Sequence, residues 1–236
     1  MPVYLYYTPI RADVNQSRCN FLKLTYAAFT NGGPHGTIKY RLLYKHTPYR
    51  SWYGKEAPPL AGAVKGGDGM AVCTLCPRRC ERVRPEGYCR MGERPRLARA
   101  ALHFGEEPCI SGTQGSGTVF FSGCSLRCVF CQNHQISAEG FGQEVSAARL
   151  RSIFEELIDK GAHNINLVNP THFAHAIGKA LERPLPVPVI YNSGGYDRVE
   201  TLRRLEGKIQ VFLPDMKYAL TEPAARYSGA EDYPQT

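Results

Sequence analysis

Apolar residues recur with a helical period between residues 147 and 160. Five apolar side chains fall on one face of this segment: Leu150, Ile153, Phe154, Leu157 and Ile158. Ser146 before the segment is a favourable N-cap residue, and Gly161 after it is a favourable helix stop. The pattern therefore predicts an amphipathic helix over 147–160.

Short apolar runs alternate with helical patterns along the same half of the chain. They predict a short buried strand over 118–121 and three further strands over 164–168, 187–191 and 209–213. After the turn Asn169-Pro170-Thr171 we expect a helix that buries Phe173, Ile177, Ala180 and Leu181, and a later helix over about 196–205. Strand–helix units joined by short loops predict an α/β fold with a parallel sheet and right-handed crossovers. Ligands of such sheets bind at the carboxyl ends of the strands.

The first part of the chain lacks this order. Residues 1–48 show no sustained periodicity, and Asn31-Gly32-Gly33-Pro34 interrupts them. Residues 54–69 are rich in Gly, Ala and Pro, which is typical of a linker or irregular loop. We therefore expect a basic N-terminal extension over 1–48, a linker and Cys-rich segment over 49–112, and the α/β core over 113–236.

Composition indicates a globular protein with a core, since 43% of the 236 residues are hydrophobic. We find no run of about 20 uninterrupted apolar residues and no secretory signal, so we expect a cytoplasmic protein without a membrane span. Much of the net charge of +8 lies in residues 1–50, where Asp13 is the single acidic residue. A solvated basic extension explains this charge, and we do not expect nucleic-acid binding.

Nine cysteines are many for a cytoplasmic chain. Cys19 and Cys109 stand apart and are expected to be ordinary thiols. The others form two clusters, one of four (Cys73, Cys76, Cys80 and Cys89) and one of three (Cys124, Cys128 and Cys131). Because thiols stay reduced in the cytoplasm, clustered cysteines there indicate metal ligands rather than disulfides.

The three-cysteine loop follows the first predicted strand of the α/β series with the spacing C-x3-C-x2-C. Three thiolates can hold three irons of a 4Fe–4S cluster and leave the fourth iron open. The alternative is a zinc site that His134 completes, since structural zinc takes four ligands. The position of the loop, at a strand end rather than in a small zinc ribbon, favours the cluster.

With Phe130 in its aromatic position, this loop resembles the C-x3-C-x-aromatic-C signature of radical S-adenosylmethionine (SAM) enzymes. The resemblance implies that the amino and carboxylate groups of SAM bind the open iron. It also implies that an electron from the cluster cleaves SAM to a 5′-deoxyadenosyl radical, and that a donor such as flavodoxin or ferredoxin supplies this electron. The protein then positions a substrate and excludes water.

Further strings, in order, resemble the uncharacterised radical SAM proteins related to pyruvate formate-lyase activating enzymes, from about residue 70 to the end. They include Glu107-Pro108-Cys109-Ile110-Ser111-Gly112, Pro170-Thr171-His172-Phe173, Gly195-Tyr196-Asp197 and Leu213-Pro214-Asp215-Met216-Lys217-Tyr218. This resemblance implies a TIM-like radical SAM barrel and, as the closest functional inference, activation of a glycyl radical enzyme; a small molecule or another protein is the alternative substrate. Such barrels have about six βα units. We count about four here, so we expect a partial barrel without its last strands.

The same resemblance suggests SAM-binding residues. In activating enzymes an Asp-x-Lys at a strand end lies close to SAM, and Asp215-Met216-Lys217 matches it; the alternative is a surface salt bridge. Asn192 ends the preceding strand and is a further candidate. A Gly-Gly-Glu-type motif is absent, and Thr171 and His172 stand in its place, either as ligand contacts or with Thr171 as a helix cap. No catalytic residue is assigned.

The four-cysteine segment begins with the spacing C-x2-C-Pro-x2-C, which the resembling proteins also carry ahead of the barrel. Four soft ligands suit tetrahedral zinc or an auxiliary iron–sulfur cluster, and unliganded thiols are the alternative. Three rival functions follow: a non-catalytic zinc or iron–sulfur binding module, an inactive truncated barrel, and a ferredoxin-like electron carrier. The carrier predicts four-cysteine ligation at both sites, which the three-cysteine loop lacks.

Overall fold

The computed structural model describes residues 63–65 and 71–236, which belong to one compact unit, Pro48–Thr236. The predicted extension 1–48 and Cys19 lie outside the described residues. The linker prediction for 54–69 was wrong where it can be compared: β1 (Ala63–Lys65) pairs antiparallel with β2 (Ala71–Cys73). Pairing lets the backbone groups of both short segments bond to each other, which an irregular loop does not offer.

A six-stranded mixed sheet forms the centre of the described unit, in the order β5-β3-β4-β6-β7-β8. Its strands are β3 (Arg96–His103), β4 (Ser116–Phe121), β5 (Gln143–Glu144), β6 (Ile165–Val168), β7 (Val189–Ser193) and β8 (Val211–Pro214). β4, β6, β7 and β8 run parallel, which confirms the predicted parallel strands. β3 pairs antiparallel with β4 on one side and with β5 on the other, and neither β3 nor β5 was predicted. In the described residues the sheet is open, and the partial barrel stays a prediction.

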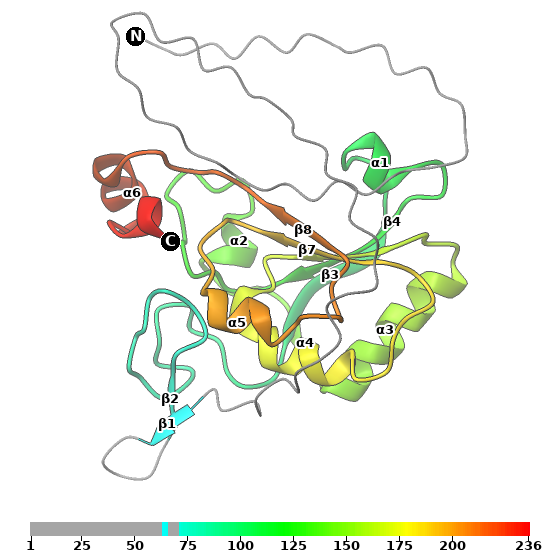
Figure 1. The fold of residues 1–236 in the computed structure, drawn as a ribbon, viewed down its shortest axis with the longest axis horizontal. Coiled ribbons are helices and arrows are strands. Elements are labelled where there is room, and N and C mark those ends of the chain that lie inside the picture. Colours follow the sequence, from blue (N-terminus) through cyan, green and yellow to red (C-terminus); the bar gives the residue numbers. More distant parts are fainter. Residues whose placement is uncertain (1–62, 66–70) are drawn as a thin grey trace, which may run out of the picture. The chain divides into compact units, whose positions relative to one another are not determined.

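Three helices lie on one side of this sheet, as Figure 1 shows: α3 (Ala147–Asp159), α4 (Ala174–Ala180) and α5 (Val199–Arg203). The predicted helix 147–160 is confirmed by α3. The predicted N-cap is confirmed as well, because the Ser146 hydroxyl accepts from the Arg149 N–H at 3.1 Å. Gly161 follows the helix with φ 98°, the left-handed conformation that glycine adopts without strain. The predicted helix 196–205 was too long at its start, because the side chains of Tyr196 and Asp197 bond to other segments instead.

Further helices and helical turns complete the unit. They are α1 (Pro108–Ser111), α2 (His134–Ser137), η1 (Thr171–Phe173), α6 (Thr221–Ser228) and η2 (Tyr233–Gln235). No helix in the described part of the chain is both long and apolar enough to span a bilayer.

The main core lies between the sheet and the three helices. Strand residues such as Val119, Phe121 and Leu167 pack there against Leu150 and Phe154 of α3. Burial of these apolar side chains is the principal driving force for folding. A second, smaller cluster lies at the carboxyl end of the strands and joins the cysteine loop to α6 and η2: Leu126, Cys128, Tyr196, Tyr218, Ala224, Ala230 and Tyr233. This second cluster surrounds the candidate site.

Candidate metal centre

The carboxyl ends of the parallel strands gather the predicted site residues at one edge of the sheet. The cysteine loop follows β4, and its Gly123 carbonyl accepts a hydrogen bond from the Asn169 side chain after β6. The main-chain N–H of Asp215, after β8, donates to the Ser193 carbonyl of β7 at 2.9 Å. The Asn169 N–H also donates to the Asn192 carbonyl of β7 at 2.8 Å, so the ends of four neighbouring strands are tied together.

Each sulfur of the three-cysteine loop receives a hydrogen bond. The Leu126 N–H donates to Cys124 at 3.3 Å, the Ser137 hydroxyl to Cys131 at 3.3 Å, and the Ser228 hydroxyl to Cys128 at 2.9 Å. Burial raises the pKa of the Cys124 thiol, and the charges of Cys128 and Cys131 raise it further.

Metal geometry is not already formed at either cysteine segment. Among residues 63–65 and 71–236, no three or more His, Cys, Asp or Glu side chains form a group placed to hold a metal ion. His134, the fourth ligand of the zinc alternative, is exposed and its ring bonds to Glu139 at 3.2 Å. The donor set nevertheless fits a cluster, because three soft sulfurs on one loop each receive a hydrogen bond that supports a thiolate. The ligand assignments remain predictions.

Phe130 lies exposed beside the cysteines, with 58% of its surface accessible. Its ring makes edge contacts with Tyr218 and Tyr227, at centroid distances of 6.2 Å each. The Val129 N–H also donates to the Tyr227 carbonyl at 3.0 Å. The outer part of the loop therefore rests on α6 and presents an aromatic face to solvent.

Asp215 and Lys217 form an ion pair of 2.7 Å at the end of β8. Burial works against the charged ammonium, but the hydrogen bond and charge of Asp215 outweigh it and raise the pKa of Lys217, and Cys128 adds to the rise. Gly195 lets the main chain of Asp215 come close to the loop after β7: its φ is 73°, and a Cβ there would lie 2.2 Å from the Asp215 carbonyl oxygen. The pair is partly exposed at the strand edge, close to the cysteine loop.

Thr171 and His172 are buried rather than exposed at this edge. The Thr171 hydroxyl donates to Asp197 at 2.6 Å and does not cap the helix. The His172 ring is 1% exposed and donates from Nε2 to the Ser122 carbonyl at 2.7 Å. Burial lowers the pKa of His172 to about 4; the bond to Ser122 opposes this and the charge of Arg84 adds to it. Neutral His172 thus supports the start of the cysteine loop.

Asp197 was not predicted as a site residue from the sequence, where it appears only in the string Gly195-Tyr196-Asp197. Its carboxylate accepts from three hydroxyls, those of Thr171, Tyr191 and Ser193, at 2.6–2.8 Å. These donors come from the ends of β6 and β7, so Asp197 fixes the two strand ends relative to each other. Asn192 lies between Tyr191 and Ser193 and is only partly buried, so its position at the strand end agrees with its candidate role.

Asn166 is a second residue that the sequence did not single out. Its neighbours Ile165 and Leu167 lie in the main core, so Asn166 points to the opposite face of the sheet. It is fully buried, and neither amide atom has a hydrogen-bond partner within the described chain. An unpaired buried amide costs about 1–3 kcal/mol. Asn166 is therefore a candidate for contacting a substrate on that face.

The four-cysteine segment contains one buried thiol, Cys76, and three partly buried thiols, Cys73, Cys80 and Cys89. Burial raises the pKa of Cys76 to about 12, and the charges of Cys80, Cys89 and Cys73 add to this rise against a backbone hydrogen bond from Arg78. Burial likewise raises the pKa of Cys89. Buried thiols that repel one another as thiolates need a cation to become thiolates together. The chemistry of this segment fits zinc or an iron–sulfur cluster.

Arg78 connects the four-cysteine segment to the three-cysteine loop. Its Nε donates to the Ser125 carbonyl at 2.7 Å, and its two terminal nitrogens donate to the carbonyls of Ser228 and Gly229 at the end of α6. The guanidinium also lies 3.9 Å from the centre of the Tyr88 ring. Arg78 therefore caps α6 and holds it against the loop.

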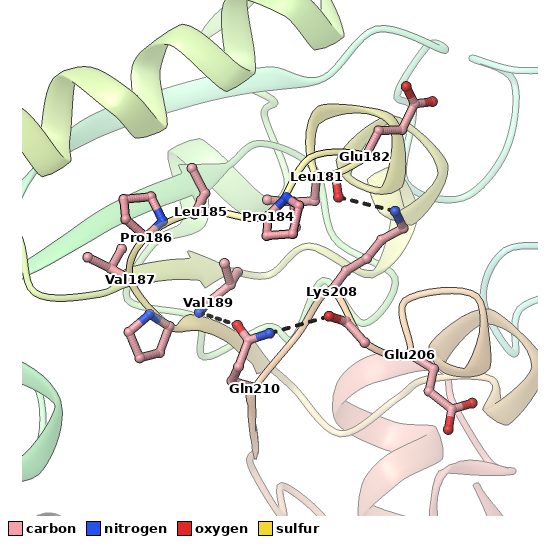
Figure 2. Close-up of a pocket in the computed structure, with 12 residues that line it drawn as sticks. Leu181, Glu182, Pro184, Leu185, Pro186, Val187, Val189, Glu206, Lys208 and Gln210 are labelled. Atoms are coloured by element: carbon pink, nitrogen blue, oxygen red, sulfur yellow. Dashed lines mark hydrogen bonds between the residues drawn. The ribbon is translucent and has the colours of Figure 1, made fainter. Parts of the chain in front are cut away.

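A hollow of about 570 Å³ lies at the opposite end of the parallel strands. Its lining includes the three prolines before β7 and the loop that precedes β8. Figure 2 shows two of its polar side chains bonded to the main chain: Lys208 donates to the Leu181 carbonyl at 3.1 Å, and Gln210 accepts from the Val189 N–H at 2.8 Å. It contains none of the predicted site residues.

Arg78→Ala should destabilise the protein, since it removes three charge-assisted hydrogen bonds and the contact with Tyr88. We expect the free energy of unfolding to fall by about 2–4 kcal/mol in urea denaturation. Arg82→Ala is the matched control, because Arg82 is an exposed arginine of the same segment. It should change stability by less than about 0.5 kcal/mol. Equal losses in the two variants would show that the Arg78 contacts contribute nothing.

His172 predicts a pH dependence of stability. Its folded-state pKa of about 4 lies below its ordinary value, so the unfolded chain takes up the proton first as the pH falls. The stabilisation is complete above pH of about 6.5 and is lost between there and about 4. His172→Gln should flatten the decline of unfolding free energy over this window, measured by urea denaturation at a series of pH values. An unchanged decline would contradict the assignment of a buried neutral ring.

The comparisons with known proteins agree with an iron–sulfur site. Residues 111–178 match the family described as a 4Fe-4S single cluster domain, and the cysteines within this range are Cys124, Cys128 and Cys131. The chain is also similar to the uncharacterized protein MJ0674 of Methanocaldococcus jannaschii, with 32% identity over 173 residues, covering 68% of this chain and 50% of that protein. The chain thus spans about half the length of this relative. A 4Fe–4S cluster-binding domain is present in the chain.

Proposed function

We propose that this chain is a radical SAM iron–sulfur protein that cleaves SAM reductively, with Cys124, Cys128 and Cys131 as the ligands of its 4Fe–4S cluster. The observation that carries the proposal is the three-thiol loop at the carboxyl end of β4, beside the ends of three further parallel strands. When bound, such a cluster supplies one electron and an iron without a protein ligand. The remaining chemistry belongs to the residues of the strand ends.

Asp215 and Lys217 offer charges that suit SAM. The amino group of SAM can donate its N–H hydrogens to the Asp215 carboxylate, and the carboxylate of SAM can accept from the Lys217 ammonium, while both groups also bind iron. The present ion pair holds the two side chains together beside the loop and raises the pKa of Lys217. Asn192 adds an amide at the neighbouring strand end, and the exposed Phe130 ring adds an apolar face. These four residues are the proposed SAM contacts.

Thr171 and His172 take a different part in the proposal. Both side chains are buried and bonded, to Asp197 and Ser122 respectively. We assign them to supporting the strand ends and the cysteine loop, so they position the site without touching SAM.

The four-cysteine segment is proposed to hold zinc or an auxiliary iron–sulfur cluster that keeps Arg78 in place. An electron donor such as flavodoxin or ferredoxin would reduce the cysteine-loop cluster. By analogy with activating enzymes, the substrate would be a glycyl radical enzyme that loses a backbone hydrogen atom; fold similarity alone does not determine it.

The test is formation of 5′-deoxyadenosine by the full chain after anaerobic iron–sulfur reconstitution and reduction with dithionite in the presence of SAM. We expect the product with the wild-type chain and its loss to background with Cys124→Ala, measured by liquid chromatography and mass spectrometry. Cys109→Ala is the matched control, because Cys109 is an exposed thiol outside the loop, and it should keep the activity. A full cluster that never cleaves SAM would instead support the non-catalytic iron–sulfur module.

A further inference from the structure

Cys128 receives the shortest of the hydrogen bonds to the three loop sulfurs. The Ser228 hydroxyl lies 2.9 Å from its sulfur, whereas the donors to Cys124 and Cys131 lie at 3.3 Å. Cys128 is 6% exposed and Ser228 is 3% exposed, so water does not compete for this bond. The donor comes from the last residue of α6, 100 residues away from Cys128 in sequence.

A third group gives this bond a direction. The Tyr218 hydroxyl lies 2.5 Å from the Ser228 hydroxyl, and Tyr218 is buried. A hydroxyl has one hydrogen to donate, and a thiolate sulfur can only accept. When Ser228 donates to a Cys128 thiolate, Tyr218 must therefore donate to Ser228. Chains of this kind polarise each member, which strengthens the final bond to sulfur.

The four-cysteine segment fixes the main chain at Ser228. The Ser228 carbonyl accepts from Arg78 and, at 3.2 Å, from the Tyr88 hydroxyl. Gly229 then ends α6 with φ 56°, a conformation that favours glycine. The serine is thus held at the end of a capped helix, with its hydroxyl directed at the sulfur.

We propose that the Tyr218–Ser228 hydrogen-bond chain raises the reduction potential of the cluster that Cys128 helps to hold. The inference rests on the proposed cluster ligation but not on SAM cleavage. Reduction adds one electron, supplied by a low-potential donor such as dithionite or a ferredoxin, and no covalent bond forms or breaks. The added charge makes the thiolate sulfurs better acceptors, so a hydrogen bond to sulfur favours the reduced state. Tyr218 and Ser228 are positioning residues and keep their protons throughout.

The experiment is an anaerobic redox titration of the reconstituted full chain, followed by electron paramagnetic resonance (EPR) of the reduced cluster. Ser228→Ala should shift the midpoint potential to more negative values at an unchanged iron content. Tyr218→Phe should shift it in the same direction by less, because the Ser228 hydroxyl remains. Ser137→Ala is the matched control, since it removes the longer hydroxyl bond to Cys131, and it should shift the potential less than Ser228→Ala.

The outcomes separate this inference from the proposed function. An unshifted potential in a fully loaded Ser228→Ala protein overturns the role of the hydrogen-bond chain and leaves the cluster assignment intact. If Ser228→Ala loses iron, Tyr218→Phe decides, and an unshifted potential there overturns the proposal. An EPR signal that persists in Cys128→Ala belongs to another site. If Cys128→Ala abolishes no EPR signal, both the ligation by Cys128 and this inference are overturned.

Discussion

The guanidinium of Arg78 is the contact on which the arrangement of the candidate centre depends. It bonds to carbonyls of the cysteine loop and of the end of α6, and it stacks on Tyr88 of its own segment. A guanidinium keeps its charge at any ordinary pH and presents several donors in a fixed plane, so it can hold carbonyls that belong to different segments. The four-cysteine segment and the three-cysteine loop are therefore parts of one structural unit.

Parallel strands impose the second constraint, because their carboxyl ends meet at one edge. The cysteine loop, Asn192 and the Asp215–Lys217 pair reach that edge from three different strands. Close approach there needs glycine: Gly123 has φ 79°, and a Cβ on it would lie 2.9 Å from the Cys89 carbonyl oxygen. Asp197 then fixes the ends of β6 and β7, and His172 fixes the start of the cysteine loop. The geometry explains why the candidate site residues gather at this edge and not in the hollow at the other end.

The sequence predicts best the elements whose apolar period is strong. The helix from Ala147 and the parallel strands β4, β6 and β7 follow directly from buried side chains such as Phe154 and Leu167, whereas β8 is an apolar strand that stays partly exposed. β3 was missed because its run of Arg and Ala residues lacks alternation, and its pairing with β4 and β5 makes it a strand. α6 and the bond from Ser228 to Cys128 were missed because they depend on contacts 100 residues apart, which no local pattern records. The burial of Thr171 and His172 could likewise not be predicted from the spacing of residues in the sequence.

The central claim is that the three-cysteine loop leaves one iron open for SAM, and EPR of the reduced, reconstituted chain tests it most directly. Spectra are recorded for the same sample before and after addition of saturating SAM. The account predicts that SAM changes the g values of the signal that depends on Cys128, because its amino and carboxylate groups take the open position. Identical spectra with and without SAM would contradict an open iron and the SAM site beside it.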